Sequence, residues 1–187
     1  MHCQRQSDGS VLLRHINAFE YNTFWELQSL ADPADHLDAK NRLYPPPYLK
    51  SEASEETRND WDEFVRTELE LQLGASMTNV LADLDKAIHE TTGETTEDED
   101  GEDDDEAEEE ESKAPPTRWT FTIPAEHVED WFRAMNAARL VMSQRYESHR
   151  TDFNYVVAAV NSGSTSRLVQ YELLTSLCDW WLQALMR

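Results

Sequence analysis

Hydrophobic side chains recur every three or four positions along most of the chain, which is the spacing of amphipathic helices. A first helix is predicted after Asn17, a favourable N-cap residue, and it ends before Asp32-Pro33. A longer helix starts at Ser54 and carries apolar residues at Trp61, Phe64, Val65, Leu69, Leu73, Met77, Val80, Leu81, Leu84 and Ile88. Because glycine costs about 1 kcal/mol relative to alanine inside a helix, we expect one helix bent at Gly74 or two helices that abut there.

Two further helices are predicted in the second half of the chain. Pro124 suits the first turn of a helix and precedes apolar residues at Val128, Trp131, Phe132, Met135, Ala138, Met142 and Tyr146. The closing helix, over residues 168–185, places Leu168, Tyr171, Leu174, Cys178, Trp181, Leu182 and Leu185 on one stripe, so its last residues should belong to the core. Residues 151–166 are compatible with a strand or with a short helix.

Short strands are indicated at the N-terminus and in the middle of the chain. His2–Arg5 and Val11–Ile16 flank Asp8-Gly9, a strong hairpin signal because glycine accepts a positive φ. Arg118–Ile123 alternates with a period of two, as a half-buried strand does. We therefore predict an α+β fold, predominantly α-helical, with helices packed around a small sheet made of the N-terminal hairpin and this one later strand.

Three consecutive prolines interrupt the helical pattern. Tyr44-Pro45-Pro46-Pro47-Tyr48 cannot be helical, because each proline removes a backbone donor and pushes its predecessor toward extended conformations. We expect this segment to cross the surface as a rigid strap, and residues 35–42 to add only a short turn before it.

Acidic residues are concentrated in one segment. The chain of 187 residues holds 38 Asp and Glu against 16 Lys and Arg, and residues 94–111 contain 14 of these acids and no base. With almost no apolar residue to bury, this segment cannot offset the entropy lost on ordering. We expect one domain over residues 1–187, interrupted by a disordered acidic insert at residues 92–116.

The charge and the lack of long apolar runs limit the kinds of partner. Outside the acidic segment, 24 acids still exceed the 16 bases, and such a surface repels nucleic-acid phosphate, so no nucleic-acid partner is expected. The first residues contain no signal-peptide run, and the longest apolar stretch, residues 156–160, is too short to span a bilayer. We expect a cytoplasmic protein with no membrane partner.

The sequence contains no recognisable catalytic or nucleotide-binding motif. The five glycines stand at positions 9, 74, 93, 101 and 163, too far apart for a phosphate-binding loop, and the six dispersed histidines form no HExxH. Cys3 and Cys178 lie far apart, so neither a zinc site nor a redox dithiol is indicated. Residues 32–38 gather Asp and His side chains that could ligate a metal, although a charged interhelical turn explains them more simply. We expect no metal and no cofactor.

Aromatic residues are numerous, and most lie on predicted helical stripes where core packing accounts for them. Trp180 is different, because it cannot face inward together with its neighbour Trp181. One of these two rings is therefore expected to be exposed or to lie in an interface, and a homodimer is possible.

A polar pair on the predicted helix after Pro124 also stands out. Asn136 and Arg139 are three residues apart and so share one helical face, close to the apolar Trp131. A half-buried guanidinium needs acceptors, and we predict that Arg139 bonds a carboxylate or carbonyl of residues 61–68 or 45–48. The alternative is a surface arginine whose stem covers apolar neighbours.

Three motifs follow one another along the chain: Leu43-Tyr44-Pro45-x-x-Tyr48, then Trp61-Asp62-Glu63-Phe64-Val65-Arg66, then Trp131 with Asn136-x-x-Arg139-Leu140. Their residues and order resemble the bacterial domain-of-unknown-function family numbered twenty-seventeen, known mostly from actinobacteria and often encoded near the ClpS proteolytic adaptor. The resemblance implies a cytoplasmic accessory or regulatory protein, and it brings no established enzyme activity.

Two classes of function are compatible with the sequence. The first is a non-enzymatic interaction or regulatory protein with an unknown protein partner. Its candidate structural or partner-contact residues are Tyr48, Trp61, Arg66, Trp131, Asn136, Arg139 and Trp180. The second is a small enzyme or anion-binding protein that uses Asn136, Arg139 and a carboxylate such as Glu63 or Asp130 to orient an anionic substrate.

Overall fold

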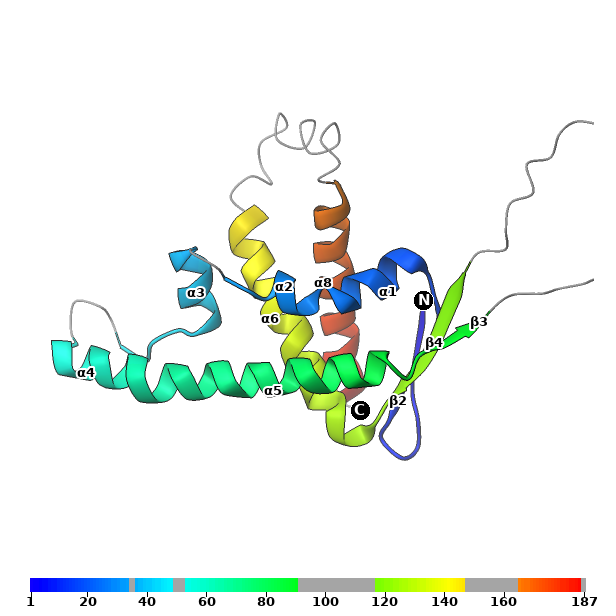
Figure 1. Ribbon diagram of the computed structural model, residues 1–187, viewed down its shortest axis with the longest axis horizontal. Helices are drawn as coiled ribbons and strands as arrows, with labels where there is room; N and C mark the ends of the chain where they lie inside the picture. Colours follow the sequence, from blue (N-terminus) through cyan, green and yellow to red (C-terminus); the bar gives the residue numbers. More distant parts are fainter. Residues whose placement is uncertain (34–35, 49–52, 91–116, 147–164, 186–187) are drawn as a thin grey trace, which may run out of the picture.

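The computed structural model describes residues 1–33, 36–48, 53–90, 117–146 and 165–185, and within them an antiparallel sheet lies at one end of a group of helices (Figure 1). Its strands are β1 (His2–Arg5), β2 (Val11–Ile16), β3 (Ile88–Glu90) and β4 (Arg118–Ile123), in the spatial order β1-β2-β4-β3. The predicted α+β fold, predominantly α-helical, is confirmed.

The N-terminal hairpin forms as its turn residues predict. Gly9 has a φ of +88°, which glycine adopts without strain, and its amide donates to the Gln6 carbonyl. The carboxylate of Asp8 accepts from the Ser10 amide at 2.9 Å and fixes the turn. In the neighbouring pair of strands, Leu13 of β2 stands opposite Phe121 of β4, so the later strand joins the hairpin as predicted.

The sheet contains one strand that the sequence pattern does not predict. Ile88 fits the apolar stripe of the preceding helix, α5 (Thr67–Leu84), yet it begins β3 and is 67% exposed. After α5 the amides of Lys86 and Ala87 donate within a tight turn, and residues 88–90 pair with β4. This pairing satisfies backbone groups that a free strand edge leaves unpaired, which explains why the helical pattern is not continued.

The longest helical stretch is continuous through Gly74. It consists of α4 (Glu55–Asp60), a π-helical segment (Trp61–Arg66) and α5, and Ser54 caps its N-terminus by accepting from the Thr57 amide at 3.1 Å. Gly74 lies inside α5 without interrupting it. The local irregularity predicted at Gly74 is found instead in the π-helical segment.

The remaining helices surround the core. The first predicted helix consists of α1 (Ala18–Trp25) and α2 (Leu27–Leu30), and the expected turn before the strap is a full helix, α3 (Leu37–Leu43). A 3-10 turn precedes α6 (Val128–Tyr146), and α6 packs against α8 (Thr165–Leu185) on one side and crosses α5 (Figure 1). The largest fully buried side chains are Trp131, Trp181, Phe24, Leu13, Ile16, Leu27, Leu84, Ile123, Met135, Met142, Leu174 and Val80.

One residue of the closing stripe departs from its predicted position. Leu182 is 45% exposed whereas Trp181 is buried, because adjacent residues point about 100° apart on a helix. The predicted acidic insert at residues 92–116 lies outside the described residues, as does most of the stretch 151–166. Among the described helices, none has the length and apolar character needed to cross a membrane.

Candidate functional site

The first half of the long helix extends away from the core (Figure 1). We call residues 55–72 the arm. Neither α4 nor the π-helical segment buries any residue, and three apolar side chains of the arm are exposed: Phe64 at 63%, Val65 at 41% and Leu71 at 65%. The apolar stripe predicts core positions for Phe64 and Val65, and this prediction is wrong because the π-helical segment packs mainly on its own helix within the described residues.

The π-helical segment changes which residues of the arm share a face. In a regular α-helix each step of four residues drifts by about 40°, so Trp61 and Leu73 would point about 120° apart. The wider π turns reduce this drift and bring Trp61 and Val65 toward the side of Leu69 and Leu73. Trp61 is accordingly half-buried, although its Nε1 has no hydrogen-bond partner in the described part of the chain.

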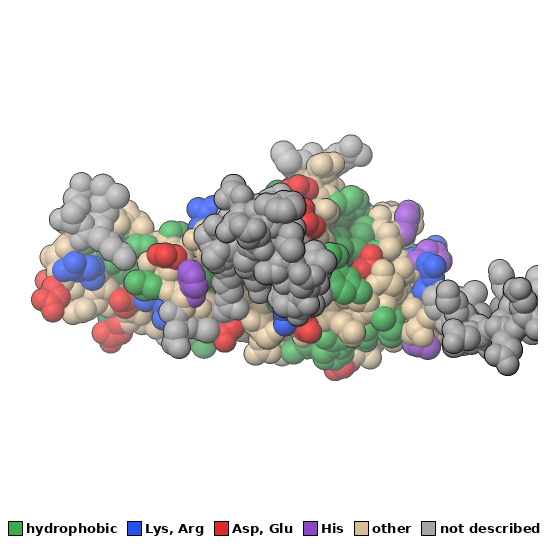
Figure 2. Space-filling view, turned by 90° about the horizontal axis from the view of Figure 1, so that it is seen from above, with side chains coloured by type: hydrophobic (Ala, Val, Ile, Leu, Met, Phe, Trp, Pro, Cys, Tyr) green, Lys and Arg blue, Asp and Glu red, His purple; other side chains and the backbone are tan. Residues whose placement is uncertain are grey.

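The exposed apolar side chains of the arm are surrounded by acids. At the arm end of the molecule, hydrophobic and acidic side chains lie next to one another (Figure 2). Arg66, one of the candidate residues, pairs with Asp62 at 2.7 Å on the arm itself. Arg66 is therefore already neutralised locally and does not contribute a free positive charge.

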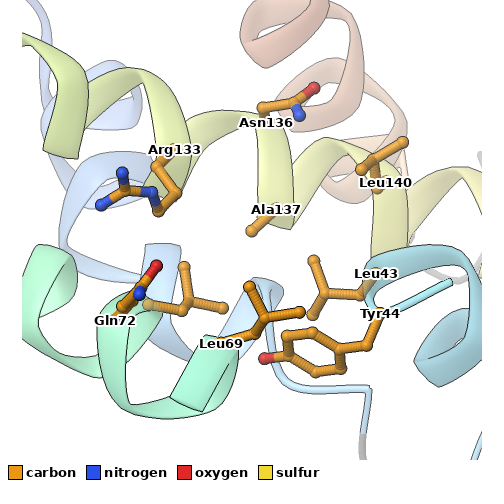
Figure 3. A pocket seen from close by; sticks show the side chains of 9 residues that line it. Leu43, Tyr44, Leu69, Gln72, Arg133, Asn136, Ala137 and Leu140 are labelled. Carbon is orange, nitrogen blue, oxygen red and sulfur yellow. The ribbon is translucent and has the colours of Figure 1, made fainter. Parts of the chain in front are cut away.

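A hollow of about 220 Å³ lies where the arm meets the rest of the molecule (Figure 3). It lies between α3, α5 and α6, and its lining residues are Leu43, Tyr44, Leu69, Gln72, Leu73, Arg133, Asn136, Ala137 and Leu140. Figure 3 shows Gln72 and Arg133 toward one side, with Leu43, Tyr44 and Leu69 toward the other. The volume is smaller than that of typical small-molecule sites and suits a single apolar side chain.

Tyr44 lines the hollow on the same side as Leu43 and Leu69 (Figure 3). Its side chain is buried, and burial, together with the carboxylates of Glu70 and Asp32, raises the pKa of Tyr44 to about 12. The hydroxyl therefore stays protonated at neutral pH and adds no negative charge to the hollow.

A group of polar contacts joins the end of α5 to the start of α6. The fully buried carboxylate of Asp83 accepts from Trp131 Nε1 at 3.0 Å, and His127 Nδ1 lies 2.9 Å from the same oxygen, Oδ2. Lys86 Nζ lies 3.3 Å from the other oxygen, Oδ1. A buried carboxylate needs such partners to offset the loss of water, so this cluster fixes α5 against α6.

Asp83 and His127 are missing from the candidate residues that the sequence provides. The available signal is the position of Asp83, which follows Val80 by three residues and directly precedes Leu84 on a buried stripe. A polar residue at such a position requires partners in the core. The sequence gives no indication of which partners these are.

A second carboxylate, Asp130, bridges the same two helices one turn away. It accepts from Ser76 Oγ and Asn79 Nδ2, both at 2.7 Å, and Arg133 Nη1 lies 3.3 Å from it. Desolvation by itself would raise the pKa of Asp130, but the hydrogen bonds from Asn79 and Ser76, with the charges of Arg133 and His127, outweigh it and hold the pKa below its ordinary value. Asp130 is therefore ionised and structurally engaged at neutral pH.

Asp130→Asn is expected to lower the free energy of unfolding by about 1 to 2 kcal/mol at pH 7 through weakened hydrogen bonds to α5. Because the folded-state pKa is depressed, the contribution of the charge is complete above the unfolded-state value of about 3.9 and is lost as the pH falls below it. Urea unfolding at pH 7 and pH 3.5 should show the difference from the natural chain shrinking in acid. Glu129→Gln, at the exposed neighbouring position, is the control and should have little effect at either pH.

The structure brings Asn136 and Arg139 together but not in the predicted way. The guanidinium of Arg139 donates to Asn136 Oδ1 at 2.7 and 3.3 Å and lies near Cys178 of α8; burial raises the pKa of this thiol to about 11 despite the nearby arginine. The predicted bond to residues 61–68 or 45–48 is wrong, because this face of α6 turns toward α8. Arg133, on another face, donates to Ser76 of α5 at 2.9 Å instead.

The other candidate residues do not converge on one site. Trp131 is a core residue whose ring contacts those of Phe24 and Phe121. Tyr48 is half-buried at the end of the strap. Trp180 is half-buried, with its ring centroid 5.6 Å from that of the fully buried Trp181. The predicted difference between the two adjacent tryptophans is therefore present, and Trp180 is the outer ring.

The arrangement predicted for an anion-binding or catalytic site is only partly present. Asn136 lines the hollow together with Arg133, but the described residues that line it include no carboxylate. Asp130 already accepts hydrogen bonds from Ser76 and Asn79 of α5, and Glu63 lies on the exposed arm. Within the described residues, no three His, Cys, Asp or Glu side chains are grouped so as to hold a metal ion.

Comparison with known protein families places the chain in a family of unknown function. The model of a domain of unknown function, DUF2017, matches residues 6–186. The matched range includes the arm, the hollow, the Asp83 cluster and all three motifs of the sequence resemblance. No curated protein and no solved structure matches the chain.

Proposed function

We propose that this chain, which belongs to the DUF2017 family of domains of unknown function, is a non-enzymatic interaction or regulatory protein of the cytoplasm. The observation that supports the proposal is the exposed apolar surface of the arm. Single exposed apolar residues are ordinary on a protein surface. Phe64, Val65 and Leu71, by contrast, lie within about two turns of one helix, and such a group of exposed apolar side chains is typical of a protein interaction site.

Burial of the exposed side chains of the arm would supply part of the energy of a specific contact. Complete burial of an aliphatic or aromatic side chain contributes about 1.5 to 3 kcal/mol, and Phe64 and Leu71 each have roughly two thirds of their surface still to bury. Partner binding at the arm would recover this energy, which is not used in the fold of the chain itself.

Phe64→Ser is expected to remove the binding of a stoichiometric partner from native cell extract while leaving the fold intact. The melting temperature should change by no more than about 2 °C, because substitutions at exposed positions have small effects on stability. Leu182→Ser is the matched control, since Leu182 is an exposed apolar residue at a distant position on α8, and it should retain the partner. Affinity capture that returns no stoichiometric partner, or only self-association, would contradict the proposed function.

A further inference from the structure

We propose that the arm binds a basic amphipathic helix of another protein, and that the exposed side chains of Phe64 and Leu71 are the central apolar contacts of that helix. This inference rests on the proposed interaction function and adds the chemistry of the partner. It is carried by the charge of the arm, by its helical backbone and by the spacing of the exposed Phe64 and Leu71.

The charge of the arm favours a basic partner. Residues 55–72 contain seven Asp and Glu against two Arg, and one of the arginines, Arg66, is paired with Asp62. The exposed apolar side chains are thus placed in a strongly negative surrounding. Lys and Arg at the rim of a partner are attracted to such a surface, and acidic partners are repelled.

The same charge argues against a second copy of this chain. Two arms brought face to face would each carry a net charge of −5, on chains whose formal net charge is −22. Like charges placed opposite one another at an interface oppose association. A homodimer through the arm is therefore disfavoured relative to a basic partner.

The backbone of the arm favours a helix over an extended segment. Its amides and carbonyls are used within α4, the π-helical segment and α5, so the arm offers no free edge to which a strand could add. A partner must bind through side chains. A helix presents its side chains at intervals of three, four and seven residues, which matches the seven-residue spacing between Phe64 and Leu71.

The hollow between α3, α5 and α6 lies on the other side of the arm. Leu69 and Leu73 line it, and Leu71 lies two residues from each of them, about 160° around the helix. The partner helix therefore binds over Phe64 and Leu71 without entering the hollow.

The test uses two synthetic 18-residue helical peptides with leucine every three or four positions, one with lysine at all other positions and one with glutamate. Titration into the full chain, followed by calorimetry, should show binding of the Leu/Lys peptide only, weakened by added salt. Phe64→Ser should weaken this binding about tenfold, as loss of one central apolar contact does, and Leu182→Ser should not change it.

Each other outcome overturns the inference in a distinguishable way. Binding that Phe64→Ser leaves unchanged would place the Leu/Lys peptide elsewhere on this acidic chain. Equal binding of the Leu/Glu peptide would reject a basic partner but keep the arm as an interaction surface. Self-association without peptide binding would contradict both the basic partner and the proposed function. If Phe64→Ser alters neither peptide binding nor recovery of the partner from extract, the proposed function fails as well.

Discussion

Asp83→Ala is expected to lower the free energy of unfolding by about 2 to 4 kcal/mol, because it leaves a buried donor without an acceptor. Trp131 Nε1 is the donor that cannot find water, since Trp131 is fully buried. His127 and Lys86 are partly exposed and can turn toward solvent, so most of the loss comes from the tryptophan and from the space left by the carboxylate. The removal of a buried charge offsets part of this cost.

For a chain of this size, 1 kcal/mol changes the melting temperature by about 2 to 4 °C, so Asp83→Ala should melt roughly 10 °C below the natural chain. Asp85→Ala provides the control on the same helix end. Asp85 is exposed, and a negative charge at a helix C-terminus is unfavourable, so its removal should be neutral or slightly stabilising. Equal melting temperatures for the two variants would show that the Asp83 cluster does not hold α5 to α6.

The sequence predicts the parts of this fold that depend on local periodicity. The helices after Ser54 and Pro124, the N-terminal hairpin and the strand around Phe121 all follow from apolar spacing, caps and turn residues. β3 could not be predicted in this way, because Ile88 continues the helical spacing of α5. Its partner in the sheet is Thr120 of β4, which is distant in the sequence. Local patterns do not contain that pairing.

The Asp83 cluster and the arm illustrate two further limits. Asp83 and Trp131 are 48 residues apart, so their hydrogen bond depends on how α5 packs against α6 and not on either helix alone. An apolar stripe shows which residues share a face, but not whether another element covers it. Phe64 has the spacing of a core residue and is nevertheless 63% exposed.

Arg139 shows the same limit for a polar residue. A separation of three residues correctly places Arg139 beside Asn136 on one face. The neighbour that this face meets is set by the rotation of α6 about its axis, which depends on the whole core. The sequence therefore identifies the pair, whereas the contact with α8 instead of α5 is determined by tertiary packing.

Trp181→Ala is expected to destabilise the fold by about 3 to 5 kcal/mol, the range observed when a large buried aromatic residue is truncated. Trp181 is 1% exposed and belongs to the core of α8. Trp180→Ala removes a ring that is only half-buried at the outer side, so its effect on the urea midpoint should be clearly smaller. The reverse order would mean that the two adjacent rings have exchanged places in solution.

Replacement by phenylalanine separates ring packing from hydrogen bonding at the buried tryptophans. Trp181 Nε1 has no partner among the described residues, so Trp181→Phe removes a buried donor that is already unpaired and loses only part of the ring volume. Trp131→Phe loses similar volume and also deprives Asp83 of a donor, which adds about 1 to 3 kcal/mol. Trp131→Phe should therefore unfold at a lower urea concentration than Trp181→Phe, and combining it with Asp83→Ala should cost less than the sum of the two single changes, because both remove the same hydrogen bond.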